Sequence, residues 1–311
     1  MNPPAHERKS SLDSLAVATL LMCCTFWGLG QVATKVTLAQ IPPLLQAGLR
    51  AAIAVALVVA WSRWRGVALF QRDGSLGAGV LAGVLFAGEF ACIFLGLQHT
   101  SASRMTVFVY TAPFVVALGM PLIARGERLG TLQWAGLAIA FAGVAFAFAE
   151  GFSGQAPAGP RQWLGDALGI GAALLWGATT LVVRASRLAT LAPEKTLAWQ
   201  LALCALLLVP AGLALGEPWP TRLEGWPLVA FAFQSVTVTF LTFLLWFWLV
   251  RHYPATKVAA FTLLTPLMGT LFGVLLLGEP LTARLAVAAV AVALGIWMVN
   301  RPVQRPQEDK R

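Results

Sequence analysis

The chain has 311 residues, of which 58% are hydrophobic and only 11% are charged, and its formal charge is +9. Soluble domains carry charges at about a quarter of their positions. This composition therefore excludes a soluble globular protein and indicates an all-α integral membrane protein.

Ten apolar stretches approach the length of about 20 residues that a helix needs to cross a bilayer. In chain order they are predicted at 14–36, 43–62, 75–98, 102–123, 130–150, 166–188, 197–216, 226–250, 255–277 and 281–300. Residues 1–13 and 301–311 are predicted to be tails. The longest connection runs from Gly151 to Gly165, which leaves no room for a soluble catalytic domain.

The sequence repeats internally, with five predicted spans in each copy, at 14–150 and 151–300. Three patterns occur twice at matching spacing: Trp27-Gly28 with Lys35 and Trp176-Gly177 with Arg184; Ala102-Ser103-Arg104 with Pro113 and Ala255-Thr256-Lys257 with Pro266; and Gly-Glu-x-Leu at 126–129 and 278–281. Internal similarity of this kind indicates a repeated architecture. Because five is odd, the second copy enters the membrane from the opposite side, which gives an inverted repeat typical of alternating-access transporters.

Basic residues are distributed by topology. Of the 22 lysines and arginines, 16 fall on the side of the two tails, four fall in or beside the opposite loops, and Lys35 and Arg50 lie within spans. By the positive-inside rule, both termini are predicted to be cytoplasmic. The positive charge is thus an orientation signal, and nucleic-acid binding is not expected.

Two helix faces carry an aromatic, then a polar, then a cationic residue at intervals of four. They are Trp27, Gln31 and Lys35 in the first copy and Trp176, Thr180 and Arg184 in the second. Such a face is poorly suited to lipid and suits a cavity. The alternative is packing of the tryptophans, with Lys35 and Arg184 extending to the membrane interface.

Glu89 is the only acidic residue deep within a predicted span, about 13 Å from the outer end at 1.5 Å per residue. Arg50 lies at a similar depth in the preceding span. An ionised group in hydrocarbon is costly and is a functional candidate. Either the two residues form a charge pair, or Glu89 binds a substrate amine or carries a proton.

Pro113 and Pro266 lie near the middle of the fourth and ninth spans and are equivalent in the repeat. Each is expected to kink its helix. The bend is either static or a hinge for gating. Glu127 and Glu279, from the Gly-Glu-x-Leu pattern, are expected at helix starts, where a carboxylate complements the helix dipole.

These doubled motifs and ten spans resemble the drug/metabolite transporter superfamily, EamA-type, over residues 14–300. The resemblance implies a bacterial inner-membrane protein with ten helices, cytoplasmic termini and a central cavity between the halves. The chain is also similar to the aromatic amino-acid exporters of that group. No nucleotide-binding motif is present, so energy is expected from a proton gradient, or else transport is passive or by exchange.

The expected function is export of neutral, large or aromatic amino acids by alternating access. Glu89 or a π face would bind the ammonium group. The carboxylate would meet Gln31, Thr180 or Gln234, and the side chain would meet Trp27, Tyr110, Trp176 or Phe243. The expected partners are a small-molecule substrate, the lipid bilayer and a coupling proton, with no cofactor and no metal.

Three other functions are alternatives to amino-acid export. Efflux of cationic drugs or of another small metabolite remains open, because the fold does not fix the substrate. An intramembrane enzyme is not expected, because His6, His99 and His252 lie in a tail or at span ends and assemble no catalytic site. A static receptor or anchor would have no use for the inverted repeat.

Overall fold

The computed structural model describes residues 9, 11–100, 102–124, 127–152, 160–277 and 283–301, and all regular structure within them is helical. Eight helical segments are long and apolar enough to cross a membrane, and two shorter apolar helices cover Thr131–Ala147 and Ala286–Asn300. The predicted ten-span, all-α architecture is confirmed. Most residues of the two predicted tails lie outside the described part of the chain.

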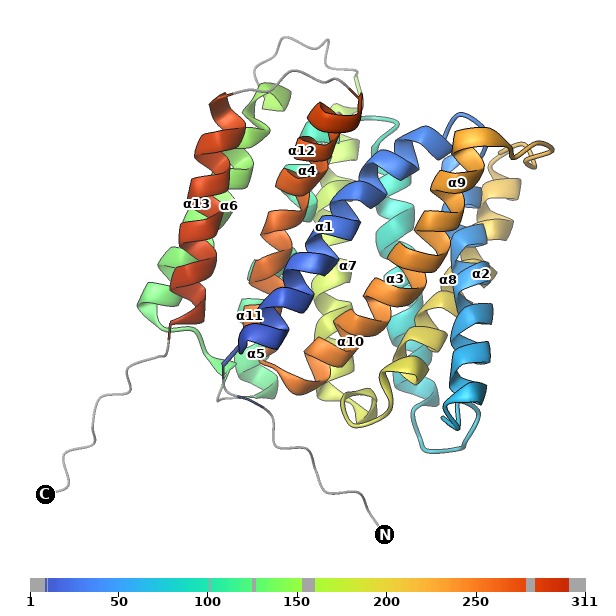
Figure 1. Ribbon diagram of the computed structural model, residues 1–311, viewed down its shortest axis with the longest axis horizontal. Coiled ribbons are helices and arrows are strands. Elements are labelled where there is room, and N and C mark those ends of the chain that lie inside the picture. The colour runs from blue at the N-terminus through green and yellow to red at the C-terminus, as the bar shows by residue number, and fades with distance from the viewer. Residues whose placement is uncertain are drawn as a thin grey trace, which may run out of the picture.

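The first half contains five spans, built from six α-helices (Figure 1). They are α1 (Ser14–Thr37), α2 (Pro43–Trp64), α3 (Leu76–Gly96), α4 (Ala102–Val109) with α5 (Ala112–Ile123), and α6 (Thr131–Ala147), followed by the short turn η2 (Ala149–Phe152).

The second half repeats this order with more interruptions. Its elements are α7 (Gln162–Ala185), η3 (Arg187–Ala189), α8 (Pro193–Ala214), α9 (Gly225–Phe233), η4 (Gln234–Thr242), α10 (Phe243–His252), α11 (Ala255–Phe261), η5 (Thr262–Leu264), α12 (Thr265–Leu277) and α13 (Ala283–Asn300). The η4 segment is a π-helix that continues α9 into α10.

Helix ends in the two halves use the same local chemistry. Pro43 and Pro193 open α2 and α8, where a missing N–H costs nothing. Gly66 and Gly216 follow the C-caps of these helices with φ of 69° and 83°. This left-handed conformation favours glycine and stops a helix. The second span of each copy is therefore bounded by the same signals.

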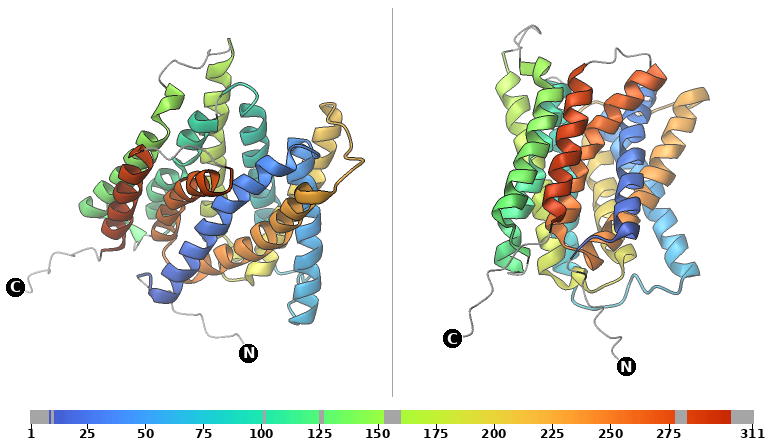
Figure 2. Two further views of the ribbon diagram at one scale, coloured as in Figure 1. Left: turned by 45° about the horizontal axis from the view of Figure 1, so that its top comes forward. Right: turned by 60° about the vertical axis from the view of Figure 1, so that its left-hand side comes forward.

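The helices pack as an inverted repeat requires. α1 packs against α9 and α12, while its counterpart α7 packs against α3, α4 and α5. α2 pairs with α8, and α6 pairs with α13 at one edge of the bundle, as both figures show (Figures 1 and 2). The last pair packs so closely that a Cβ on Gly295 would clash with the carbonyl oxygen of Gly136. Small residues thus let these backbones approach.

The fourth and ninth spans are interrupted at equivalent places. The fourth breaks between Val109 and Ala112, and the ninth passes through the 3₁₀ turn η5. Pro113 and Pro266 are each the second residue of the helix that follows the break. In a first helical turn the ring displaces no established hydrogen bond, so proline fits there and marks the interruption.

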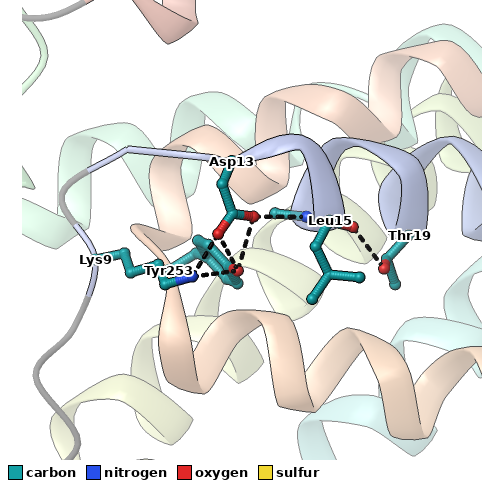
Figure 3. A network of polar contacts seen from close by, with 6 residues as sticks. Lys9, Asp13, Leu15, Thr19 and Tyr253 are labelled. Atoms are coloured by element: carbon teal, nitrogen blue, oxygen red, sulfur yellow. Dashed lines mark hydrogen bonds and ion pairs between the residues drawn. The ribbon is translucent and has the colours of Figure 1, made fainter.

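The start of α1 and the end of α13 lie on one side of the bundle, called here the termini side (Figure 1). There Lys9 and Asp13 contact Tyr253, which lies between α10 and α11 (Figure 3). Asp13 caps α1 by accepting from the Ala16 N–H at 2.9 Å, forms an ion pair with Lys9, and accepts from the Tyr253 hydroxyl at 3.0 Å. The hydrogen bond from Lys9 lowers the pKa of Asp13 to about 2.

Candidate functional site

A chain of aromatic contacts crosses the middle of the bundle from α1 to α3. The ring centroids of Trp27 and Phe243 are 5.9 Å apart, those of Phe243 and Phe86 are 5.5 Å apart, and those of Phe86 and Phe90 are 5.0 Å apart. The Trp27 indole is held in place, because its Nε1–H donates to Thr242 Oγ1 at 2.8 Å. These residues come from α1, α3 and α10 and form one aromatic wall.

Two charged residues lie beside this wall. Arg50 lies seven residues after the start of α2, and Glu89 lies seven residues before the end of α3, so both are about 10 Å below the same face. The Arg50 guanidinium lies over the Phe90 ring, 4.7 Å from its centroid.

The predicted proximity of Arg50 and Glu89 is thus found, but the direct ion pair is not. Their charges are close enough to interact electrostatically. Neither side chain forms an ion pair or a hydrogen bond with another described residue.

A second aromatic wall comes from α7 and from the break between α4 and α5. Tyr110 lies in that break, and its ring is edge-on to Trp176 with centroids 5.7 Å apart. The Tyr110 hydroxyl is near Gln31 and Thr265 and within electrostatic range of Glu89. The helix interruption therefore brings Tyr110 toward α1 and α3.

Six of the eight predicted substrate residues are brought together by these contacts. They are Trp27, Gln31, Glu89, Tyr110, Trp176 and Phe243. Gln31 is exposed although it lies mid-span, with its carboxamide against Gly269 of α12. Tyr110 lies near Gln31, so the two walls approach each other at this point.

The other two predicted substrate residues are occupied elsewhere in this structure. Gln234 is 0% exposed; its Oε1 accepts from Gln46 Nε2 at 2.9 Å, and its Nε2 donates to Thr37 Oγ1 at 2.8 Å. Thr180 is 4% exposed, and its hydroxyl donates back to the Trp176 carbonyl at 3.3 Å. Gln234 thus joins neighbouring helices, and Thr180 bonds within its own helix.

A buried ionic cluster joins the two halves on the termini side. Arg184, at the end of α7, forms an ion pair with Glu127, and its Nη1 donates to the Val250 carbonyl at 3.0 Å. Glu127 also accepts from the backbone N–H of Ala255, the first residue of α11, at 2.7 Å. The cluster therefore connects α7 and the α5–α6 loop to α10 and α11.

This cluster corrects two expectations. Arg184 is 5% exposed and ion-paired, so it does not extend to the membrane interface. Glu127 does complement a helix N-terminus, but that of α11 rather than that of α6, which begins four residues later at Thr131. Glu279 lies outside the described residues.

A second ionic contact closes the same side between the α2–α3 loop and α8. Lys195 Nζ lies 2.5 Å from Asp73 Oδ2 and 2.8 Å from the Gln71 carbonyl. The hydrogen bond from Lys195 lowers the pKa of Asp73 to about 2. Arg187 donates to the Asp73 carbonyl at 2.7 Å. Polar contacts between distant segments therefore hold the termini side together.

On the opposite side, polar contacts join helices that already pack along their length. Arg104 Nη2 lies 2.5 Å from Asp166 Oδ2, which links α4 to α7. Glu217 accepts from the first turn of α2, at Leu44 N and Leu45 N, at 3.0 and 2.8 Å. These contacts do not join the α1–α12 pair to the α4–α7 pair. On the termini side, Arg184 links α7 to α10 and pairs with Glu127.

Comparison with known protein families identifies the family of this chain. The model of the EamA-like transporter family matches residues 14–149 and 163–301. The chain belongs to the EamA-like transporter family. This EamA-like protein is a small-molecule membrane transporter and not an enzyme.

Curated relatives cover nearly the whole EamA-like chain. An "Uncharacterized transporter" of Archaeoglobus fulgidus is 26% identical over 93% of this chain and 98% of its own. A "Probable amino-acid metabolite efflux pump" of Salmonella typhimurium is 26% identical, and one of Escherichia coli is 25% identical, each over 89% of this chain and 92% of the relative. A solved crystal structure is similar in fold, with a TM-score of 0.79 at 20% identity over 92% of this chain and 96% of that one.

Two of the hollows in the described part of the EamA-like chain lie away from this site. One, of about 330 Å³, is a groove at the end of α2 lined by Val59, Ser62, Arg63 and residues 67–71. The other, of about 10 Å³, lies beside Arg184 and Arg251. The predicted substrate residues line neither of them. In the described residues no three His, Cys, Asp or Glu side chains are grouped as metal ligands.

Phe86 and Phe90 belong to the first wall but are not among the residues predicted from the sequence. A signal was available, because Phe86, Phe90 and Phe94 recur at intervals of four and so share one face of α3. Their place in the wall depends on the contact between Phe86 and Phe243, which are 157 positions apart in the sequence. Only the folded chain brings those two elements together.

Proposed function

We propose that this EamA-like transporter exports neutral amino acids with large or aromatic side chains. The main observation behind the proposal is that Glu89, a buried carboxylate without an ion pair, lies beside the two aromatic walls. These walls contain Trp27, Phe243, Tyr110 and Trp176. Two relatives named "Probable amino-acid metabolite efflux pump" support the same substrate class.

The chemistry of the site fits an ammonium group attached to a bulky apolar body. Glu89 offers a carboxylate at 9% exposure, where an opposite charge is attracted more strongly than in water. The surrounding ring faces bind a cation or stack on an aromatic side chain. A ligand of this kind would offset the cost of keeping Glu89 within the span.

Alternating access is supported by the ionic contacts on the termini side. The termini side is closed by the Arg184–Glu127 and Lys195–Asp73 contacts, which join distant segments. Transport would require these contacts to open while the opposite side closes. We propose that the termini side is cytoplasmic in the bacterial inner membrane, so that export begins with their opening, and that an inward proton gradient drives the cycle.

Organic cations are a second candidate, and Glu89 among aromatic rings is the observation that favours them. A substrate panel separates the two. Purified protein in proteoliposomes would be given labelled phenylalanine, tryptophan, alanine and tetraphenylphosphonium, with and without an imposed proton gradient. We expect saturable movement of the two aromatic amino acids, accelerated by the gradient. Movement of tetraphenylphosphonium alone would overturn the amino-acid assignment.

A further inference from the structure

Arg50 is the second charged group at this site, and sequence reasoning gave it no role beyond pairing with Glu89. The structure leaves that pair unmade. The guanidinium lies over the Phe90 ring at 4.7 Å from the centroid, and it has no hydrogen bond or ion pair with any described residue. One aromatic face does not satisfy five N–H donors.

A guanidinium without an anionic partner is costly about 10 Å inside a span. Arg50 could reduce this cost by pairing with Glu89, which lies at equal depth on α3. It is instead oriented over the ring of Phe90, the residue next to Glu89 in the chain. The cation therefore lies over a ring next to Glu89 in sequence, and the two charges interact without a direct ion pair.

Two opposite charges that are held apart beside an aromatic surface are complementary to a zwitterion. An α-amino acid carries its ammonium and carboxylate on a single carbon, so both groups can be bound at once if protein charges of opposite sign converge on them. The planar fork of arginine binds a carboxylate through two parallel hydrogen bonds. No other described side chain near Glu89 carries a positive charge, and Gln234 is fully engaged with Gln46 and Thr37.

We propose that Arg50 binds the substrate carboxylate while Glu89 binds its ammonium group, so that the transporter requires both groups on its substrate. This inference rests on the proposed function, and it narrows the substrate to molecules with a free carboxylate. It replaces Gln31, Thr180 and Gln234 as carboxylate donors. Phe86 and Phe90 then form the surface on which the substrate side chain or backbone lies.

The test compares phenylalanine with phenylalaninamide, which keeps the ring and the ammonium group but lacks the carboxylate. Binding to purified protein by calorimetry and initial transport rates in proteoliposomes would both be measured. The wild type should prefer phenylalanine by tenfold to a hundredfold, the range for a hydrogen bond to a charged group. Equal binding of the two ligands by the wild type would overturn the inference without any variant.

Arg50→Gln should lower the affinity for phenylalanine by tenfold to a hundredfold and leave the affinity for phenylalaninamide unchanged. The preference for phenylalanine is then lost. Arg50→Lys keeps the positive charge but not the planar guanidinium, so it should recover part of the affinity for phenylalanine. Arg63→Gln, on the same helix but exposed at its end, is the matched control and should behave as wild type. An equal loss for both ligands in Arg50→Gln would indicate a structural role and contradict the proposal.

The outcomes also separate this inference from the proposed function. If the wild type moves phenylalanine and Arg50→Gln does so equally well, amino-acid export stands and the role of Arg50 is wrong. If the wild type moves carboxylates that lack an amine and Arg50→Gln does not, Arg50 is supported and the amino-acid assignment fails. Movement of tetraphenylphosphonium alone would overturn both.

Discussion

At the scale of single residues, the site depends on polar groups that fix the aromatic walls. The Trp27 indole is the clearest case, because its only N–H is satisfied by Thr242 Oγ1 at 2.8 Å, and Thr242 is itself 0% exposed. A buried N–H that loses its partner costs about 1–3 kcal/mol. The orientation of Trp27 against Phe243 thus depends on one hydroxyl.

Thr242→Val should therefore raise the KM for aromatic amino acids by roughly threefold to tenfold, because the indole must reorient to find another acceptor. Valine keeps the volume of threonine, so the fold should persist. Transport kinetics in proteoliposomes would measure the effect. Thr19→Val, which removes only a bond to the Leu15 carbonyl on the same helix, is the control. Unchanged kinetics in Thr242→Val would refute the role given to this bond.

Much of the site was predictable at this scale, and the misses have physical reasons. Trp27, Glu89 and Tyr110 were recognisable because costly or amphipathic groups stand out in apolar helices. Gln234 and Thr180 stand out equally, yet their side chains already form hydrogen bonds with residues of α1, α2 and α7. Whether a polar group faces a substrate or another helix is decided by its partners, which the linear sequence does not display.

At the scale of elements, interruptions concentrate where the halves meet. The fourth and ninth spans break before Pro113 and Pro266, and the eighth contains the π-helical segment η4. Pro113 and Pro266 predicted the first two interruptions. The π segment has no proline, and its register arises from packing, so periodicity could not have located it. Helix ends agreed with the apolar runs to within a few residues.

Pro113→Ala and Pro266→Ala should each slow transport several-fold while changing substrate affinity little, if the breaks act as hinges. Alanine permits the helix to continue through the interruption, which would stiffen the span. Turnover and Kd would be measured separately. Pro210→Ala, within the uninterrupted helix α8, is the matched control. Wild-type turnover in both variants would favour a static bend.

At the scale of the whole molecule, charge gathers where the two halves close. The side chain of Arg184 is 1% exposed and that of Glu127 is 11% exposed, so their ion pair is largely shielded from water. The repeat predicted the positions of both residues but not their meeting, because Glu127 reaches across to α11 rather than to its own helix. Inverted repeats create such contacts between segments that are remote in sequence.

Glu127→Gln should destabilise this closed form, because it leaves a buried guanidinium without its counter-charge, at a cost of about 3–5 kcal/mol. The Tm in detergent should fall by roughly 5–15 °C. Adding Arg184→Gln should restore part of the loss, since no charge then remains unpaired. Glu224→Gln, at an exposed helix start, is the control. Equal Tm values for wild type and Glu127→Gln would contradict the role of the cluster.

Orientation in the membrane can be tested on the same scale. Phe70, between α2 and α3, is 82% exposed on the termini side, and Trp219, between α8 and α9, is 53% exposed on the opposite side. In a background without the four native cysteines, Phe70→Cys should react only with cytoplasmic reagent and Trp219→Cys only with external reagent. The reverse pattern would invert the topology and the direction of transport.

The central claim is that Glu89 receives the ammonium group of an amino acid within the bundle. The most direct measurement is phenylalanine counterflow into proteoliposomes that contain equal amounts of wild-type protein or Glu89→Gln. Because a hydrogen bond to a charged group contributes about 1.5–3 kcal/mol, the initial rate should fall at least tenfold in Glu89→Gln, with the protein still folded. A folded Glu89→Gln variant that exchanges phenylalanine at the wild-type rate would contradict the account.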